Sequence, residues 1–395
     1  MPNTILTPTA VTREALRVLH QKLNFVGNIV RDYDDSFAQK GAKIGDTIKV
    51  RLPNQYVVRD GATLNAQDTT ESSVSLQISS QKGVDLNFTS GELTLSLDDF
   101  SQRILEPAMS VLAANIEADA LNMALDVYQA VNNIGSAISL NKVLMGRKAL
   151  NDALAPMDNQ RTALLNTQDN VDLIDSLKGL FQDSEAIKKQ YKEGIMGRTA
   201  GLDFYENTLL ANQATGTAAS ATTYTVNGAN QTGSGVVVAT GATTFKKGDI
   251  VTFAGCNRVH PETKADTGVL QQFVVTADHA GGAGTLQIAP AIVTTGGAKN
   301  VAASPTNGGA VVKVGGASAI YKPSMVFHKE AFAFATADLI MPGGVDFAAR
   351  ETIDGLSCRI VRAYDINNDK FPCRLDILYG YKTLRAQLAA RILSN

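Results

Sequence analysis

Apolar residues recur with helical spacing near the start of the chain, in the stretch "TREALRVLHQKLNFVGNIV". Thr12 stands where an N-cap would lie, so the pattern predicts an amphipathic helix inside an N-terminal arm, residues 1–40. An ordinary core helix fits the same periodicity, and we keep both interpretations. The apolar face would carry Leu16, Leu19, Leu23, Val26 and Val30.

Two runs of alternating apolar and polar residues follow, residues 48–58 and 74–88, with a polar Asp/Gly/Asn/Thr stretch between them. A period of two residues is typical of strands, and it predicts a long hairpin within residues 41–92. The polar middle has little to bury, so we expect it to project as a loop whose backbone finds partners elsewhere. A hairpin on the surface of a sheet is the alternative.

From Leu97 the helical period returns and continues to Ile134. Pro107 should cap or kink this helix, which leaves residues 107–133, a rod of about 40 Å at a rise of about 1.5 Å per residue. We predict a spine helix within residues 93–136, across which other elements lie. The apolar stripe is narrow, so a coiled-coil partner is the alternative.

The remaining chain changes composition twice. Residues 137–210 combine helical patterns with the apolar run "RTALLNT", which indicates helix, strand, helix in an α/β or α+β domain. Residues 211–320 are rich in Gly and β-branched residues and poor in Leu and charge, which predicts an inserted β-barrel. The strand-like runs "SMVFHKEAFAF", "SCRIVRAYD" and "RLDILYGYKTL" then resume the interrupted domain.

Overall composition is that of a globular protein. The 395 residues are 44% hydrophobic and 19% charged, enough for two or more packed units. No run of about 18 apolar residues and no signal-peptide pattern is present, so we expect a protein that is neither exported nor membrane-bound. A net charge of -2 without a Lys/Arg run predicts only weak, non-specific contact with nucleic acid, and the lack of Trp removes the usual stacking anchors.

Cys256 and His260 are spaced as C-x3-H in "FKKGDIVTFAGCNRVHPETK", with His279 further on. A zinc site needs a second close pair of ligands, and the sequence has none. We interpret Cys256 as a small buried group at a barrel corner and His260 as a loop residue before Pro261. An odd number of widely spaced cysteines fits reduced thiols, and we expect all three to be packing residues. They are Cys256, Cys358 and Cys373.

The run "DINNDK" begins like a calcium loop at Asp365. Lys370 stands where that loop needs Gly, and Asp376 replaces the final Glu, so we predict a hairpin loop instead. Phosphate-loop, serine-hydrolase and zinc-protease motifs are absent from the sequence. Two pairs of adjacent carboxylates are interpreted as solvated or helix-capping. These are Asp34 with Asp35 and Asp98 with Asp99. We therefore predict no catalytic, cofactor-binding or metal site, and no enzyme.

Four stretches carry a family resemblance: "RILEPAMSVLAANIEADAL", "GDIVTFAGCNRVHPETK", "MPGGVDFAARETIDGLSCRIVRAYD" and "LYGYKTLRAQLAARIL". With the order of elements, they resemble the major capsid (coat) proteins of tailed bacteriophages with the Hong Kong 97-type fold. The resemblance is to the short-tailed-phage group that carries an insertion domain. It implies an α+β fold divided as follows: N-terminal arm 1–40, extended hairpin (E-loop) 41–92, spine helix and peripheral domain 93–136, axial domain 137–210, inserted all-β barrel 211–320, axial domain and hinge 321–364, and C-terminal peripheral-domain strands 365–395.

The same resemblance implies a structural function. The chain would form pentamers and hexamers of an icosahedral shell, the capsid of a virion, which is assembled in the bacterial host cytoplasm and encloses double-stranded DNA. Implied partners are a scaffolding protein, a portal and a decoration protein, with no membrane and no cofactor. Because no lysine lies between Lys49 and Lys82, the hairpin tip cannot supply a Lys–Asn cross-link, so we expect non-covalent contacts. An encapsulin-like compartment and a cell-surface binding module are the alternatives.

Overall fold

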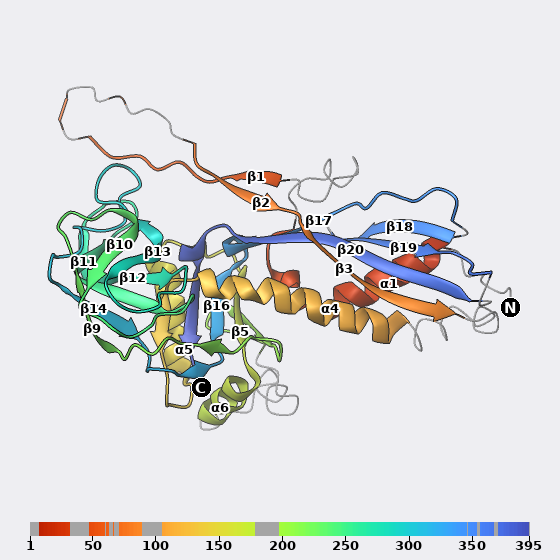
Figure 1. The fold of residues 1–395 in the computed structure, drawn as a ribbon, viewed down its shortest axis with the longest axis horizontal. Coiled ribbons are helices and arrows are strands. Elements are labelled where there is room, and N and C mark those ends of the chain that lie inside the picture. The colour runs from red at the N-terminus through yellow and green to blue at the C-terminus, as the bar shows by residue number, and fades with distance from the viewer. Residues whose placement is uncertain are drawn as a thin grey trace. The chain divides into compact units, whose positions relative to one another are not determined.

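The computed structural model describes residues 8–31, 47–59, 61–62, 66, 71–88, 105–177, 197–345, 347–353, 356–366 and 370–394. It is a mixed α+β fold with few helices (Figure 1). Packing divides the chain into two compact units. Unit 1 comprises Met1–Arg51, Ser73–Leu121 and Phe332–Leu384, and unit 2 comprises Leu52–Ser72, Asn122–Ala331 and Arg385–Asn395.

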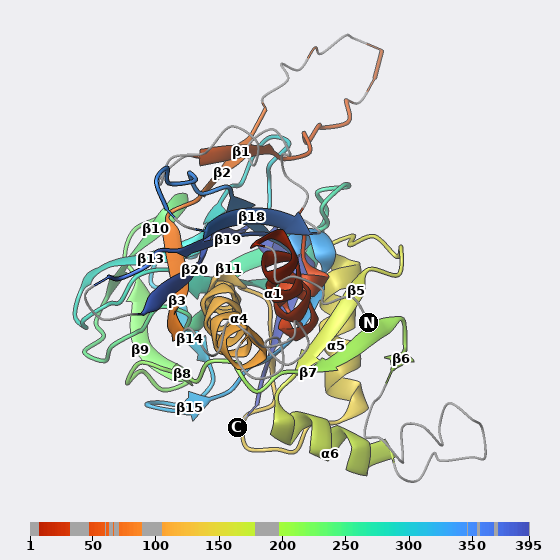
Figure 2. The ribbon, with the colours of Figure 1, turned by 90° about the vertical axis from the view of Figure 1, so that its right-hand side faces the viewer.

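Unit 1 is built on an antiparallel sheet whose longest strand is β20 (Phe371–Thr383). Along one edge β20 pairs with β17 and β19, and along the other with β3. Figure 2 shows helices α1 and α4 lying together on one side of this sheet. The other elements are α1 (Pro8–Lys22), β3 (Ser80–Phe88), α4 (Glu106–Leu121), β17 (Phe332–Ala337), β18 (Phe347–Ile353) and β19 (Leu356–Arg362).

Helix α1 is a core helix of unit 1. It begins at Pro8, so the predicted N-cap Thr12 lies inside the helix, where its side chain is fully buried. The helix contacts α4, β18 and β19, and its apolar face excludes water from that junction. Of the two interpretations of this segment, the core helix is the one observed. Its buried apolar residues are Val11, Ala15, Leu16, Val18 and Leu19.

The predicted spine helix is shorter than its periodicity suggested. Pro107 occupies the first turn of α4, where its missing N–H costs nothing. The α-helix ends at Leu121, a 3-10 turn η4 (Asn122–Asp126) follows, and Ala130–Asn132 form strand β4. The prediction of helix through residue 133 is wrong because β4 finds a parallel partner in β21 (Ala389–Leu393). Residues 89–104 lie outside the described residues.

The predicted hairpin is also shorter. Strand β1 (Thr47–Arg51) pairs with β2 (Ser73–Gln77), while residues 80–88 form β3 and pair with β20. The second run breaks where Leu76 and Ile78 are buried against unit 1. There the chain crosses β20 at Gly380, whose added Cβ would lie 2.1 Å from the Gln77 carbonyl oxygen. Only glycine allows that crossing.

Unit 2 contains a mixed sheet in the order β4-β21-β16-β5-β7-β6. The predicted helix, strand, helix order is confirmed, with α5 contacting β16 and β21. Gly146 allows close packing, because its added Cβ would stand 3.1 Å from Val326 Cγ2. The elements not yet placed are α5 (Leu140–Asp152), β5 (Arg161–Leu165), α6 (Thr167–Leu177), β6 (Arg198–Thr199), β7 (Leu202–Glu206) and β16 (Ser324–His328).

Six strands of unit 2 close into a barrel in the order β10-β13-β12-β11-β14-β9. Its interior is filled by aromatic and β-branched side chains, among them Tyr224, Phe245, Phe253 and Phe273. The strands are β9 (Ala221–Val226), β10 (Gly233–Ala239), β11 (Ile250–Val259), β12 (Asp266–Val275), β13 (Gly284–Ile292) and β14 (Ala310–Val314).

The unit boundaries differ from the predicted ranges after the barrel. The run "SMVFHKEAFAF" is two strands, β16 and β17, separated by the 3-10 turn η6 (Lys329–Ala331). Residues 332–364, predicted as axial, belong to unit 1, because β17 and β19 are hydrogen-bonded to β20. Residues 385–395, predicted as peripheral, belong to unit 2, because β21 pairs with β16.

Candidate assembly surfaces and the polar networks behind them

The cysteine and histidine residues singled out in the sequence do not form a site. Cys256 is buried in the barrel within β11, before the strand ends, and burial raises the pKa of its thiol to about 12. His260 follows β11, and its Nδ1 accepts the backbone N–H groups of Glu262 and Thr263, each at 3.3 Å. Burial likewise raises the pKa values of Cys358 and Cys373 to about 12. Within the described residues, no group of three or more His, Cys, Asp or Glu could hold a metal ion.

The "DINNDK" run joins β19 to β20, as predicted. Asp365 and Lys370 form an isolated antiparallel bridge at the base of this connection. Residues 367–369 lie outside the described residues, as do the carboxylate pairs at 34–35 and 98–99.

An exposed apolar run lies on the extended segment that follows β1. We call residues 52–59 the hairpin segment. Its Tyr56, Val57 and Val58 are 57%, 41% and 87% exposed. At its start the Leu52 N–H donates to the Ser72 carbonyl at 2.8 Å. Exposed apolar surface of this kind is common at protein–protein contacts, so the run is a candidate contact surface.

A charged face covers one side of the unit 1 sheet. Arg359 Nη2 lies 2.6 Å from Asp376 Oδ2, and Arg374 Nε lies 3.0 Å from Asp85 Oδ1. The ion pair with Asp85 raises the pKa of Arg374. Because each charge has an opposite neighbour, the face is polar but balanced, which suits a reversible protein contact. A hollow of about 350 Å³ in it is lined by Gln81, Lys82, Gly83, Asp85, Arg374 and Asp376.

Gly83 makes room for this arrangement. It is the register partner of Asp376 across β3 and β20. A Cβ at position 83 would lie 2.5 Å from both Asp376 Oδ1 and the Leu375 carbonyl oxygen. The Asp376 carboxylate therefore lies over the space that a side chain would occupy.

The opposite side of β20 is fixed to α4 by a further set of polar contacts. Asp119 Oδ2 accepts the Tyr379 hydroxyl at 2.5 Å and lies 2.7 Å from Lys82 Nζ. Burial and then the Asp119 carboxylate raise the pKa of Tyr379. One carboxylate thus joins two strands of the sheet to the helix beneath them.

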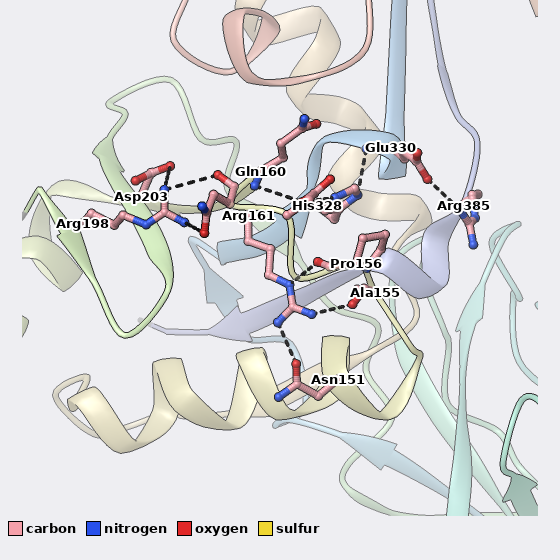
Figure 3. A network of polar contacts seen from close by, with 12 residues as sticks. Asn151, Ala155, Pro156, Gln160, Arg161, Arg198, Asp203, His328, Glu330 and Arg385 are labelled. Carbon is pink, nitrogen blue, oxygen red and sulfur yellow. Dashed lines mark hydrogen bonds and ion pairs between the residues drawn. The ribbon is translucent and has the colours of Figure 1, made fainter.

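Figure 3 shows a polar network in unit 2 around Arg161, at the start of β5. The buried Arg161 guanidinium donates to Pro156 O at 2.9 Å, Ala155 O at 2.6 Å and Asn151 Oδ1 at 2.6 Å. This fork fixes the connection between α5 and β5, because carbonyl oxygens that no strand satisfies find a donor there.

The same network holds the end of β16. His328 Nδ1 accepts the Glu330 N–H, so its Nε2 carries the proton that is donated to Asp158 Oδ1 at 3.0 Å. Burial opposes ionisation of Asp158, but the interactions with His328 and the hydrogen bond from the Gln160 N–H together outweigh it and lower the pKa of Asp158. Glu330 pairs with Arg385 at 2.7 Å (Figure 3). These polar groups form hydrogen bonds and ion pairs with one another, which is typical of a network that supports the structure.

Comparison with known proteins identifies the family. A family model described as P22 coat protein (gene protein 5) matches residues 26–391. The chain belongs to the P22 coat protein family. It is therefore a major capsid protein of a tailed phage, a structural protein that forms the homo-oligomeric shell of the virion.

Solved structures similar to the coat protein include two from phages. A Mycobacterium phage Che8 structure matches with 14% identity and a TM-score of 0.49, over 94% of this chain and 90% of that chain. The asymmetric unit of the bacteriophage PhiM1 mature capsid matches with 10% identity and a TM-score of 0.47, over 94% and 87%. No curated protein sequence matches the coat protein. In the described part of the coat protein, no helix is long and apolar enough to cross a membrane.

The sequence pattern predicts a hairpin that includes residues 48–58, but it does not indicate the residues that support the surfaces of the coat protein. Gly83, Asp119 and Arg161 have no distinctive sequence neighbours, and their roles depend on contacts between distant segments. The only local signal was alternation of charge along "RLDI", which places Arg374 and Asp376 on one face of a strand.

Proposed function

We propose that the coat protein assembles into pentamers and hexamers of an icosahedral shell around double-stranded DNA, through non-covalent contacts. The exposed apolar run Tyr56–Val58 carries this proposal. Covering these side chains with a second copy removes apolar surface from water, while an extended backbone can bind along a neighbour's surface. The hairpin segment would lie over a neighbouring subunit. The sequence has no lysine between Lys49 and Lys82 that could form a covalent Lys–Asn cross-link.

We further propose a Hong Kong 97-type fold, with unit 1 as the peripheral part and the mixed sheet of unit 2 as the axial part. Residues 211–320 would be its inserted barrel domain. The strands on either side of the barrel, β8 (Gln213–Ala214) and β15 (Ile320–Tyr321), pair with each other. The chain thus enters and leaves the barrel at adjacent points, which is typical of an inserted domain.

The partners of the shell follow from the family. A scaffolding protein would guide assembly, a portal would occupy one vertex, a decoration protein would bind outside, and assembly would take place in the cytoplasm of a bacterial host. With a net charge of -2, contact with the packaged DNA would be weak and non-specific. The role is structural, without catalysis.

Electron microscopy tests the proposal directly. The coat protein is expressed alone and together with the products of neighbouring phage genes, and particles are imaged. We expect closed particles of uniform size, which boiling in detergent reduces to the 41.8 kDa chain. A small oligomer of fixed size under every condition would contradict the assembly, and a ladder of cross-linked chains would contradict its non-covalent character.

A further inference from the structure

The hairpin segment and the barrel belong to the same compact unit, and they touch at one glycine. Gly297 lies in the connection from β13 to β14. A Cβ there would stand 2.4 Å from the Gln55 carbonyl oxygen, 2.9 Å from its carbon and 3.4 Å from Tyr56 N. Two backbones therefore meet directly, with no side chain between them. The contact lies next to the exposed Tyr56–Val58 run.

Gly296 and Gly297 are adjacent, but glycine is needed at the two positions for different reasons. Gly296 has φ +75° and nothing within 4 Å of an added Cβ, so it is needed for the turn itself. Gly297 has no positive φ, and any residue could adopt its backbone conformation. Glycine is required at 297 only by the space that Gln55 occupies.

The turn that carries Gly297 is braced from below by Asn300. The Asn300 side chain accepts the Val293 N–H at 2.9 Å and donates to the Ala291 carbonyl at 2.7 Å. Its backbone N–H donates to the Val293 carbonyl at 3.0 Å, and its carbonyl accepts the Val259 N–H at 3.2 Å. These bonds close the turn and join it to the end of β11.

The end of β11 is in turn fixed to α5. Arg258 Nη2 lies 2.5 Å from Asp152 Oδ2, and Lys148 pairs with the same carboxylate at 2.8 Å. Partial burial of Asp152 opposes ionisation, but the hydrogen bonds from Lys148 and Arg258 outweigh it and lower its pKa. A continuous series of contacts therefore leads from α5 through the barrel to the hairpin segment.

We propose that the turn at residues 296–297 is a bracket that holds the hairpin segment of its own chain and sets the direction in which Tyr56, Val57 and Val58 face a second copy. The bracket holds backbone and leaves those side chains in solvent, so the segment is oriented before a neighbour arrives. Orienting the segment in advance lowers the entropy lost on association. This inference rests on the proposed contact between the segment and a neighbouring subunit.

The test compares unassembled full-length proteins. In Gly297→Val the added side chain meets the Gln55 backbone and displaces the segment. We expect hydrogen exchange in residues 52–59 to accelerate about threefold or more, and tryptic cleavage after Arg59 to accelerate similarly. Gly343→Val is the matched control, because Gly343 also lacks a positive φ and has nothing within 4 Å. Asn300→Ala removes the brace without adding bulk and should accelerate exchange in the same segment.

Unchanged exchange and cleavage of residues 52–59 in both Gly297→Val and Asn300→Ala would overturn the bracket. Should Gly297→Val fail to fold, Asn300→Ala alone decides. On co-expression, Gly297→Val should yield fewer closed particles than Gly343→Val, and equal yields would also count against the bracket. Failure of the proposed assembly is distinguishable, because then even the wild-type protein forms no particles although its segment is protected.

Discussion

Glu117 on α4 accepts the backbone N–H of Phe25, a residue 92 positions earlier in the chain. Its second oxygen accepts the Val26 N–H at 3.3 Å. Glu117 is 1% exposed, and Phe25 is fully buried with its ring 5.4 Å from that of Phe332. A carboxylate thus accepts N–H groups at the start of the 3-10 turn η1 (Val26–Asn28). The connection after α1 is fixed to α4 by this contact.

Replacing Glu117 with Ala should destabilise unit 1. The buried Phe25 and Val26 N–H groups would lose the acceptor that Glu117 provides, a loss of about 2 kcal/mol in the free energy of unfolding. Glu117→Gln keeps one acceptor oxygen and should lose less. Chemical denaturation of the unassembled protein measures both values. An alanine variant as stable as the wild type would show that the contact contributes nothing.

Gly83→Ala should disturb the charged face. Its methyl group would meet the Leu375 carbonyl and the Asp376 carboxylate, and the backbone atom cannot move aside cheaply. We expect a loss of about 1–3 kcal/mol in the free energy of unfolding. Gly27→Ala is the comparison, because Gly27 has nothing within 4 Å of an added Cβ. If both variants lost the same free energy of unfolding, the effect would be due to the removal of a glycine and not to the contacts at position 83.

Asp169 on α6 should make stability depend on pH. Burial raises its pKa, although hydrogen bonds from Ser324, Ser394 and Asn166 oppose the shift. The folded state therefore binds the proton more tightly than the unfolded chain. This stabilisation is complete below the unfolded pKa and is lost as pH rises through the folded pKa. Asp169→Asn does not titrate, so its stability relative to wild type should increase with pH across that window, as urea titrations at several pH values can show.

Asp152 should make stability depend on pH in the direction opposite to that of Asp169. Its pKa is lowered, because the hydrogen bonds from Lys148 and Arg258 outweigh the effect of burial. Its contribution is present above the unfolded pKa and is lost as pH falls through the folded pKa. Asp152→Asn should therefore be less stable than wild type at neutral pH and approach it in acid. For either variant, a pH profile of the opposite sign, or one that does not change with pH, would refute the assignment for that residue.

Val58→Asp should separate assembly from folding. Val58 is 87% exposed, so its replacement should change the free energy of unfolding by less than about 0.5 kcal/mol. A carboxylate in the covered interface, however, would lose its hydration, and the yield of closed particles should fall at least about tenfold. Val58→Thr has a similar shape and should still assemble. Normal shells from Val58→Asp would remove the hairpin segment from the interface.

Arg161→Met should loosen the connection between α5 and β5. The guanidinium donates three hydrogen bonds from a buried position, and methionine donates none. We expect a loss of about 3 kcal/mol in the free energy of unfolding. Arg161→Lys keeps the charge but not the fork, so it should recover only part of the loss. Full recovery with lysine would show that charge alone matters there.

Local patterns were sufficient where an element's partners are near in sequence or where its composition is extreme. Helix α5, strand β5 and helix α6 follow from periodicity, and the barrel follows from its Gly-rich, β-branched composition. The end of α4 at Leu121 did not follow, because β4 depends on β21, which comes much later in the chain. The break after Gln77 depends in the same way on Gly380.

The roles of the supporting residues Gly297 and Glu117 could not be predicted from the sequence, for a related reason. Gly297 in "TTGGAKN" resembles any turn glycine, and nothing nearby indicates that Gln55 will lie against it. Glu117 occupies a regular position in a helix, where a solvated carboxylate would have been the ordinary expectation. Such roles arise when two segments that are distant in the sequence come into contact. No local pattern in a single sequence shows which segments will meet.

The closed barrel limits unwanted strand pairing between copies of the coat protein. Every one of its strands has a hydrogen-bonded neighbour on both sides, so the barrel has no edge strand to offer to a stray chain. A shell protein meets many copies of itself, and exposed edge strands would be templates for unwanted pairing between those copies. A sheet joined into a ring can be displayed many times over without seeding fibrils.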